Sequence, residues 1–426
     1  MSRGPWIDTP LSRITSKIGS GATPRGGKDS YRGDGISLIR SLNVYDFEFD
    51  RNNLAHINDA QADQLANVKV QRGDILLNIT GASVARCCMV PEDVLPARVN
   101  QHVAIIRCDP DKADNRFVYY SINSPGYKHH LLTLAQGGAT REALTKQTIE
   151  QFQVSLPPLP IQRRISSILA AYDELIENNT RRAAILEEMA RRIYEEWFVR
   201  FRFPGHEGVR MVESELGLVP EGWAPCRLER VCSRMNSGNT PSRSNPDYWD
   251  GGTVAWYKTK ELWDGYLFES EERITELAVA EKKSRVFEAG TILMAIYGSP
   301  TVGRLGITTG RCACNQAALG MLPDPTKVTF WMLYYTLLAL RVEFNNKAQG
   351  AAQQNISKEK VAEMPFLLPA METQRRFDEV VGPMQGMLRN LQERNRNLRT
   401  TRDILLPKLI SGELSVENIE IAREAP

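Results

Sequence analysis

An internal repeat is the feature of this sequence that most constrains its fold. Short segments of the first half return in the second half at an offset of 217 residues. They are Trp6 and Trp223, Leu11 and Leu228, SGATP at 20–24 and SGNTP at 237–241, GDIL at 73–76 and GTIL at 290–293, Gly81 and Gly298, and, at slightly smaller offsets, Asn100-Gln101 with Asn315-Gln316 and Thr145-Lys146 with Ser357-Lys358. A duplication of this length predicts two similar domains, each followed by a similar helical segment.

The composition is that of an ordinary globular protein. Hydrophobic residues make up 42% and charged residues 24% of the 426 residues, and this length allows two to four domains. The sequence has no run of about 18 apolar residues that would predict a membrane span. The N-terminus MSRGPWIDTP has no apolar signal core, so we expect a cytoplasmic protein.

Net charge and cysteine content exclude little by themselves. The formal net charge of +2 is small for a nucleic-acid-binding protein, but such binding depends on local charge. The seven cysteines form no CxxC pair and are not spaced with the five histidines as zinc ligands. We expect reduced, mostly buried thiols rather than disulfides or a metal site.

The pattern of each copy indicates a mixed domain with a strand-rich centre. Short apolar runs bounded by Gly, Asn, Asp and Pro are typical of strands. In the first copy such runs lie at 36–39, 74–79 and 103–107, and helical patterns lie at 115–121 and 126–134. In the second copy the expected strands lie at 254–257, 291–297 and 317–322, and a longer helix at 329–347.

A different pattern follows each copy. Apolar residues spaced by three and four over about five heptads predict a long amphipathic helix with a coiled-coil-like seam. The seam residues are Ile161, Ile165, Ile168, Tyr172, Leu175, Leu186, Ile193 and Trp197 in the first helix and Met384, Leu388, Leu391, Leu398 and Leu405 in the second. Asn179 and Asn395 also fall on the seams, and Gly382-Pro383 should kink or split the second helix. Since neither helix can bury its stripe alone, we expect the two to pack on each other, antiparallel if an approximate two-fold axis relates the repeats.

Loops of both copies carry small, polar and basic residues of the kinds that contact DNA. The loop SGATPRGGK at 20–28 is not a phosphate-binding P-loop, because Ala22 replaces its first glycine and Asp29 its Ser/Thr. The candidate DNA-binding residues are Arg25, Lys28, Arg40, Ser41, Thr80, Gly81, Ser83, Thr140, Arg141 and Lys146 in the first copy and Arg243, Lys258, Thr259, Lys260, Tyr297, Ser299, Thr301, Gln353 and Lys358 in the second.

Structural explanations exist for the same residues. Tight turns and solvated surface also select glycine, hydroxyl and basic side chains. Thr145 and Ser357 are suited to cap a helix N-terminus. The amide pairs Asn100-Gln101 and Asn315-Gln316 either read adenine or satisfy buried backbone groups.

The sequence lacks catalytic signatures. It has no Gly-x-Gly-x-x-Gly run after a strand, no P-loop and no Asn/Asp-Pro-Pro-aromatic run of an amino-methyltransferase. A loose nuclease-like pattern, Pro246-Asp247 with Glu281-Lys282-Lys283, has no working counterpart in the first copy. A self-contained enzyme with degenerate motifs and a scaffold that only gathers proteins are the alternatives to a DNA-binding subunit.

Four motifs carry a family resemblance. LPPLPIQRR at 156–164 and LPAMETQRR at 368–376 each lead into a long helix, ELGLVPEGW at 215–223 opens the second copy, and KLISGEL lies at 408–414. With these motifs, the chain resembles the specificity (S) subunits of type I restriction–modification systems over nearly its whole length. Ala370-Met371 is a mild departure from the first LP motif.

The resemblance implies an α+β fold with a pseudo-two-fold internal repeat, in which two similar mixed α/β target-recognition domains are joined by two long helices packed as an antiparallel coiled coil. The corresponding segments are target-recognition domain 1 at 1–155, spacer helix 1 at 156–203, a linker at 204–222, target-recognition domain 2 at 223–367, spacer helix 2 at 368–415 and a tail at 416–426.

The resemblance also implies a non-catalytic subunit, each of whose domains reads one half of a bipartite target in double-stranded DNA. Two modification subunits, which bind S-adenosylmethionine and methylate adenine, would dock on the spacer and the domains. Restriction (motor–nuclease) subunits that use ATP and Mg would join this core. The chain itself is expected to bind no cofactor, metal or membrane.

Overall fold

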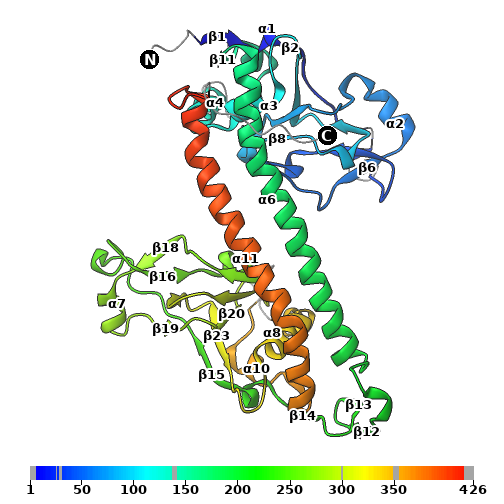
Figure 1. Ribbon diagram of the computed structural model, residues 1–426, viewed down its shortest axis with the longest axis vertical. Coiled ribbons are helices and arrows are strands. Elements are labelled where there is room, and N and C mark those ends of the chain that lie inside the picture. The colour runs from blue at the N-terminus through cyan, green and yellow to red at the C-terminus, as the bar shows by residue number, and fades with distance from the viewer. Residues whose placement is uncertain are drawn as a thin grey trace. The chain divides into compact units, whose positions relative to one another are not determined.

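The computed structural model describes residues 6–24, 26–27, 31–136, 142–298, 301–348 and 355–416. The chain forms two units, one comprising residues 1–177 and 396–426 and the other residues 178–395. Both long helices, α6 (Leu159–Tyr194) and α11 (Met371–Ile410), contribute residues to each unit (Figure 1). None of the helices in the described part of the chain is long and apolar enough to cross a membrane.

The first unit is built on two small sheets. One has the strand order β2-β10-β7-β8, and its neighbouring strands are antiparallel. The other has the order β6-β3-β9, in which β3 and β9 are parallel. The strands are β2 (Thr15–Ser20), β3 (Ile36–Ile39), β6 (Ala55–Ile57), β7 (Ile75–Asn78), β8 (Cys87–Met89), β9 (Ala97–Val99) and β10 (Val103–Cys108), with the short pairs β4 (Val44–Tyr45) and β5 (Glu48–Phe49), and β1 (Ile7–Pro10) and β11 (Gln153–Leu156). The helices before α6 are α1 (Leu11–Ile14), α2 (Asp59–Gln64), α3 (Asn115–Asn123), α4 (Pro125–Gln136) and α5 (Lys146–Gln151).

The second unit repeats this topology with additional strands. Its sheets have the orders β15-β23-β20-β21-β17 and β18-β16-β22-β19, and β16 and β22 are again parallel. The strands are β15 (Cys232–Ser237), β16 (Val254–Tyr257), β17 (Gly265–Leu267), β18 (Glu272–Ile274), β19 (Val286–Phe287), β20 (Ile292–Ala295), β21 (Leu305–Thr308), β22 (Cys312–Cys314) and β23 (Ala318–Pro323), with the pairs β12 (Met211–Ser214) and β13 (Gly217–Pro220), and β14 (Ala224–Arg227) and β24 (Pro365–Leu368). The helices before α11 are α7 (Glu276–Ala280), α8 (Phe330–Ala339), α9 (Arg341–Lys347) and α10 (Lys358–Ala362).

The expected strands and helices of both copies are present, and apart from the helix over 329–347 their bounds lie within two residues of those predicted. Strands β3 and β16 have the predicted bounds. The helix expected over 329–347 is two consecutive helices, α8 and α9.

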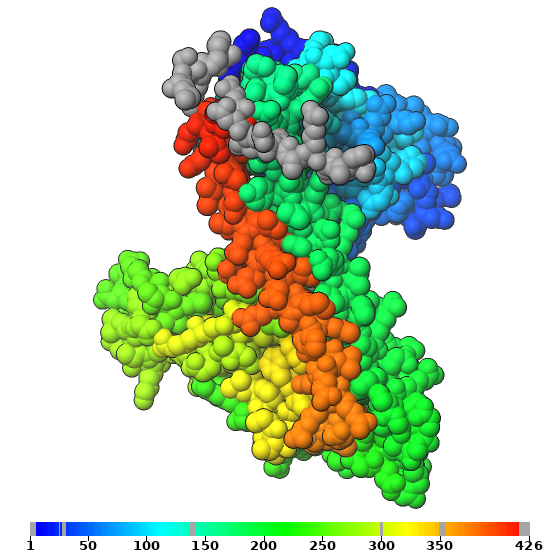
Figure 2. Space-filling model, in the orientation of Figure 1, coloured from blue at the N-terminus to red at the C-terminus, as the bar shows by residue number. Residues whose placement is uncertain are grey.

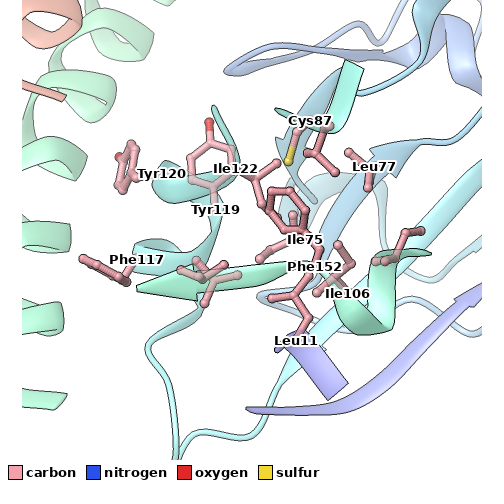
Figure 3. Close-up of a cluster of buried hydrophobic side chains, with 14 of the residues drawn as sticks. Leu11, Ile75, Leu77, Cys87, Ile106, Phe117, Tyr119, Tyr120, Ile122 and Phe152 are labelled. Atoms are coloured by element: carbon pink, nitrogen blue, oxygen red, sulfur yellow. The ribbon is translucent and has the colours of Figure 1, made fainter. Parts of the chain in front are cut away.

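The central strands are buried on both faces of their sheet, which explains why apolar residues dominate them. Ile75 and Leu77 of β7 face the cluster that contains Ile106 of β10 and Phe117 of α3 (Figure 3). Leu76, between them, belongs to a second cluster on the other face of the sheet. Since successive side chains of a strand point to opposite faces, a strand buried on both faces reads as a continuous apolar run.

A buried glutamine fixes the start of each long helix. Gln162 accepts a hydrogen bond from the backbone N–H of Asp114 at 2.9 Å and donates to the carbonyl of Pro157 at 2.8 Å. In the second unit Gln374 accepts from the N–H of Thr329 at 2.9 Å and donates to the carbonyl of Pro369 at 2.8 Å. These bonds tie the LP motif to the N-terminus of α3 or α8, which explains the glutamine in both QRR motifs.

Helix α11 is continuous for 40 residues, so Gly382-Pro383 does not split it, which was one of the two outcomes expected there. Proline removes one backbone bond from a helix interior and costs about 3 kcal/mol. Phe377 and Val381 are fully buried in the second unit's core, and this packing outweighs the local cost. The helix ends at Ile410, and Gly412 takes the left-handed conformation with a φ of +69°, as expected just after a helix terminus.

Each unit packs one part of α6 beside one part of α11. In the first unit the predicted seam residues Ile161, Ile165 and Ile168 share a core cluster with Leu405. In the second unit Ile193 and Trp197 share a cluster with Phe377 and Met384 of α11. Figure 2 shows α11 of the second unit in orange beside the yellow segment that contains α8 and α9.

The remaining seam residues differ in burial. Leu388 and Leu391 are buried, and Tyr172, Leu186 and Leu398 are half-buried. Leu175 is 52% exposed, and its neighbour Ile176 is buried instead. The assignment of Leu175 to the seam is therefore wrong, because a straight helix drifts by about 20° per heptad relative to a 3.5-residue repeat.

The two seam asparagines of the second unit meet. The amide of Asn179 donates to the side-chain oxygen of Asn395 at 2.9 Å. The amide of Asn395 donates in turn to the hydroxyl of Thr180 at 3.0 Å. Buried amides satisfied in this way allow one axial alignment of two helices and penalise others.

Candidate nucleic-acid interface

Four loops of the first unit meet through side-chain and backbone hydrogen bonds. The hydroxyl of Thr23 donates to the amide oxygen of Gln101. His102 lies next along the chain, and its Nδ1 is 2.7 Å from the hydroxyl of Thr80. The backbone N–H of Gly81 donates to the carbonyl of Glu142 at 3.1 Å. The structure therefore brings together the loop after β2, the glycine loop after β7, the Asn100-Gln101 turn and the segment before α5.

The second unit contains the same arrangement. The hydroxyl of Thr240 donates to the amide oxygen of Gln316 at 2.5 Å. The N–H of Gly298 donates to the side chain of Asn355 at 3.1 Å, beside the start of α10. Tyr297 is 37% exposed on this loop. Repetition of these bonds shows that Gln101 and Gln316 hold loops together through threonine hydroxyls, which neither interpretation of the amide pairs predicted. Asn100 does accept from a backbone group, the N–H of His102 at 3.0 Å.

One glycine in each unit permits this approach. A Cβ atom on Gly21 would lie 1.6 Å from the carbonyl oxygen of Val99. A Cβ on Gly238 would lie 2.0 Å from the carbonyl oxygen of Cys314. Only glycine allows backbone segments this close, so the SGxTP repeat has a structural reason independent of any ligand.

The basic segments follow β3 and β16, as predicted, in short 3-10 turns. The N–H of Arg40 donates to the side chain of Asn43 at 3.0 Å, and that of Lys258 donates to Glu261 at 2.8 Å. The guanidinium of Arg40 donates to the carbonyl of Asn53 and lies 5.0 Å from the ring centre of Tyr31. Within the described residues Arg40 has no carboxylate partner.

The corresponding cations of the second unit are all in ion pairs. Lys258 contacts Glu272 at 2.9 Å and Glu271 at 3.0 Å. Lys260 pairs with Glu271 at 2.6 Å. Arg243 pairs with Glu272 at 2.6 Å and stacks 3.7 Å above the ring centre of Trp249.

These contacts stabilise the ionised carboxylates. Hydrogen bonds from Lys260 and Lys258 hold the pKa of Glu271 below its ordinary value. Burial alone would raise the pKa of Glu272, but hydrogen bonds from Lys258 and Arg243 outweigh it and lower that pKa. Sequence reasoning missed both glutamates. The pairing of β16 with β18 sets Glu272 opposite Trp256, and no periodicity of the sequence reveals this pairing.

The other described candidates lie on the same loops. Ser41, Thr259, Ser83 and Lys358 are half-buried, and Gly81 is exposed. The hydroxyl of Thr301 donates to the carbonyl of Tyr297 at 2.9 Å, and exposed Lys146 pairs with Glu150 at 3.4 Å. Six predicted residues lie outside the described residues: Arg25, Lys28, Thr140, Arg141, Ser299 and Gln353.

The predicted helix caps are confirmed. The hydroxyl of Thr145 accepts from the N–H of Thr148 at 3.0 Å at the start of α5. The hydroxyl of Ser357 accepts from the N–H of Lys360 at 3.3 Å at the start of α10. Capping satisfies backbone donors that a helix leaves unpaired, so these side chains are already engaged.

Cysteine and acidic side chains do not assemble into a reactive centre in the described part of the chain. All seven cysteines are free thiols, as expected. Burial raises the pKa of Cys87, Cys108 and Cys232 to about 12, which leaves them un-ionised and inert. Among the described residues, no cluster of three or more His, Cys, Asp or Glu side chains could hold a metal ion.

Two segments of the chain, residues 28–188 and 220–380, match the family described as the type I restriction modification DNA specificity domain. The chain belongs to this family. The predicted specificity subunit is thereby confirmed, and in this family the role of the chain is recognition of a DNA sequence rather than catalysis.

Individual relatives agree over nearly the full length. The chain is 25% identical over 420 residues to the type I restriction enzyme MjaIX specificity subunit of Methanocaldococcus jannaschii, covering 97% of this chain and 94% of the relative. It is 20% identical to the HindI specificity subunit of Haemophilus influenzae, covering 89% of this chain and 94% of that one. Its fold resembles the S subunit of the type I restriction–modification system from M. genitalium, with a TM-score of 0.60, 13% identity and coverage of 96% and 97%.

Proposed function

We propose that this chain reads an interrupted DNA sequence in two halves, one half by each unit. The observation that carries this proposal is the double occurrence of one fold, with a separate family match in each copy. Both units present the same loops, while the charged side chains on those loops differ. A shared scaffold with different surface residues is what two reading domains for two different half-sites require.

In this proposal α6 and α11 form an antiparallel coiled-coil spacer, and a pseudo-two-fold axis relates the two repeats. Support comes from contacts within the units, where the start of α6 packs with the end of α11 and the end of α6 with the start of α11. A helix of 36 residues is about 54 Å long, or on the order of 16 base pairs. Because 16 base pairs are about one and a half helical turns, recognition domains attached somewhat inside the ends of such a spacer would address half-sites about one helical turn apart.

The chemistry is assigned to partners. Two modification subunits that bind S-adenosylmethionine would dock on the spacer and the domains and methylate adenine in double-stranded DNA, and restriction subunits would supply ATP- and Mg-dependent cleavage. This chain would bind none of these cofactors. The relatives' names, as specificity subunits of type I restriction enzymes, support this division.

The deciding experiment is a methylation map. DNA exposed to the chain together with its modification subunits should carry methyladenine in one motif of two fixed parts and an unspecified gap. Insertion of one helical turn into α6 should lengthen the gap and leave both half-sites unchanged. Altered half-sites with an unchanged gap would contradict the spacer role, and absence of sequence-selective DNA retention would favour a scaffold that only gathers proteins.

A further inference from the structure

Among the described residues, an exposed aromatic ring with an arginine stacked on it occurs in both units, at matched positions. Tyr45 is 39% exposed, and the guanidinium carbon of Arg86 lies 4.6 Å from its ring centre. Trp263 is 69% exposed, and that of Arg304 lies 4.1 Å from its ring centre. Both residues of the pair recur at an offset of 218, so the stack is part of the repeat.

The same anchor holds each stack in place. Asp46, next to Tyr45, accepts hydrogen bonds from the N–H of Cys87 at 3.0 Å and from Lys128 at 2.6 Å. Asp264, next to Trp263, accepts from the N–H of Leu305 at 2.9 Å and from Arg341 at 2.8 Å.

Cys87 and Leu305 directly follow the two stacked arginines and begin β8 and β21 (β8 is marked in Figure 1). Each aspartate therefore ties the ring segment to the arginine segment, which makes the stack a built feature rather than a chance contact.

The arginines keep donors available for a ligand. Within the described residues neither Arg86 nor Arg304 has a carboxylate partner. This differs from Lys258 and Arg243, whose charges are compensated by glutamates in the second unit. The stacked pairs thus offer uncompensated positive charge beside exposed apolar surface, in the same form on both units.

We propose that each pair is a docking site for a protein partner that presents a carboxylate to the guanidinium and an apolar side chain to the ring. One copy of the same partner would bind each unit. This inference rests on the proposed function, which calls for two identical modification subunits. Arginine, tyrosine and tryptophan are the residues most enriched in the energetically dominant part of protein interfaces.

A protein fits these pairs better than DNA does. In an intact duplex the base faces are stacked, so an exposed indole or phenol could not stack on them and would meet base edges, sugar and phosphate. Residues that read different half-sites should also differ between the units, whereas a surface for two copies of one partner should be repeated. The pairs are repeated.

The test measures how many modification subunits of the same system bind the full chain, by native mass spectrometry and sedimentation. The wild type should bind two. Tyr45→Ala with Arg86→Gln should leave one, as should Trp263→Ala with Arg304→Gln, and the chain with all four changes should bind about 30-fold more weakly or not at all. Arg51→Gln is the control, because Arg51 is exposed and the residue 218 positions later is Glu269, so this cation is not repeated.

The outcomes separate the two proposals. Two partners on the wild type and two on the fourfold variant would overturn the docking inference alone. No partner on the wild type would overturn the proposed function as well. Unchanged stoichiometry with weaker retention on duplex DNA would reassign the pairs to DNA. Thermal unfolding verifies folding of each variant, and Arg86→Gln and Arg304→Gln alone, which keep both rings, give the same test if a double variant unfolds.

Discussion

In the first unit, β6 lies beside β3 with Ala55 opposite Leu38; in the second, β18 lies beside β16 with Glu272 opposite Trp256. At these matched positions the first unit has Leu54-Ala55 and the second has Glu271-Glu272. The strand order and register around them are the same. The difference of two carboxylates decides whether the neighbouring cations are compensated by acids.

A second exchange occurs where the recognition fold meets each long helix. In the first unit Asp114 caps α3, and the hydroxyl of Ser166 on α6 donates to it at 2.5 Å. In the second unit the hydroxyl is on Thr329 at the start of α8, and the carboxylate, Asp378, is on α11; they are 2.7 Å apart. The two side chains have changed places across the same contact. The duplicated domains thus keep the hydrogen bond between hydroxyl and carboxylate, but the carboxylate lies on opposite sides of the contact in the two units.

The largest expected effect is on the contact that both units share. Gln162→Leu and Gln374→Leu should each destabilise their own unit by about 2–4 kcal/mol, because the first removes the side-chain partner of two backbone groups and the second that of three. Hydrogen exchange at the amides of α3 and α8, measured on the full chain, reports the two units separately. Gln147→Leu, at an exposed position of α5, is the control. If only one of the two variants destabilised its unit, the two glutamines would not have the same role in the two units.

The close glycine contact should give the next largest effect. Gly21→Ala and Gly238→Ala place a methyl group against a carbonyl and should cost about 1–3 kcal/mol, since the backbone has to shift. The shift would separate the SGxTP loop from Gln101 or Gln316 and weaken binding to the matching half-site. Urea unfolding and half-site competition measure both effects. Gly19→Ala, whose Cβ would meet nothing within 4 Å, should behave as wild type.

The sequence was sufficient to locate strands and helices where the local pattern and the tertiary structure agree. Short apolar runs bounded by turn residues located β3 and β16 because strands buried on both faces need such runs. It was insufficient where packing competes with a local signal. Pro383 lies inside a continuous helix, and the seam moves from Leu175 to Ile176, because the buried contacts of each helix decide both outcomes.

The candidate site was predictable in its loops but not in its electrostatics. The repeat identified the segments that the structure brings together, including those of Thr80, Gln101 and Ser357. The ion pairs of Lys258 with Glu271 and Glu272 depend on strand pairing between residues more than ten positions apart, which periodicity does not reveal. The DNA-binding roles of these residues stay a prediction.

A moderate effect should follow from removing the two acids that distinguish the units. Glu271→Gln with Glu272→Gln releases Lys258, Lys260 and Arg243 in the second unit. Affinity for duplex DNA should rise about 10-fold at low salt, and the slope of log K against log salt should steepen by roughly 1–2, at about 0.9 per added phosphate contact. Fluorescence anisotropy over a salt series measures this. Glu276→Gln, which frees Arg311 elsewhere in the unit, is the matched control, and equal effects would remove the special role of Glu271 and Glu272.

The smallest expected effect tests the exchanged carboxylate. Burial raises the pKa of Asp378 to about 6, against the opposing hydrogen bond from Thr329. The folded state therefore holds this proton more tightly than the unfolded chain, so the free energy of unfolding should fall as pH rises from about 4 to about 7. Because the side chain is partly exposed, the fall should be on the order of 1 kcal/mol.

Asp378→Asn keeps an oxygen that can accept from Thr329 but cannot ionise. It should unfold at higher urea than the wild type at pH 7 and at about the same urea at pH 4. Ser166, at the matched position of the first unit, is the reference: Ser166→Ala removes the donor to Asp114 and should leave the pH dependence that belongs to Asp378 in place. If Asp378→Asn left the pH profile of unfolding unchanged, the exchange of carboxylate and hydroxyl would have no electrostatic consequence. The units would then differ at this contact only in which helix carries the carboxylate and which carries the hydroxyl.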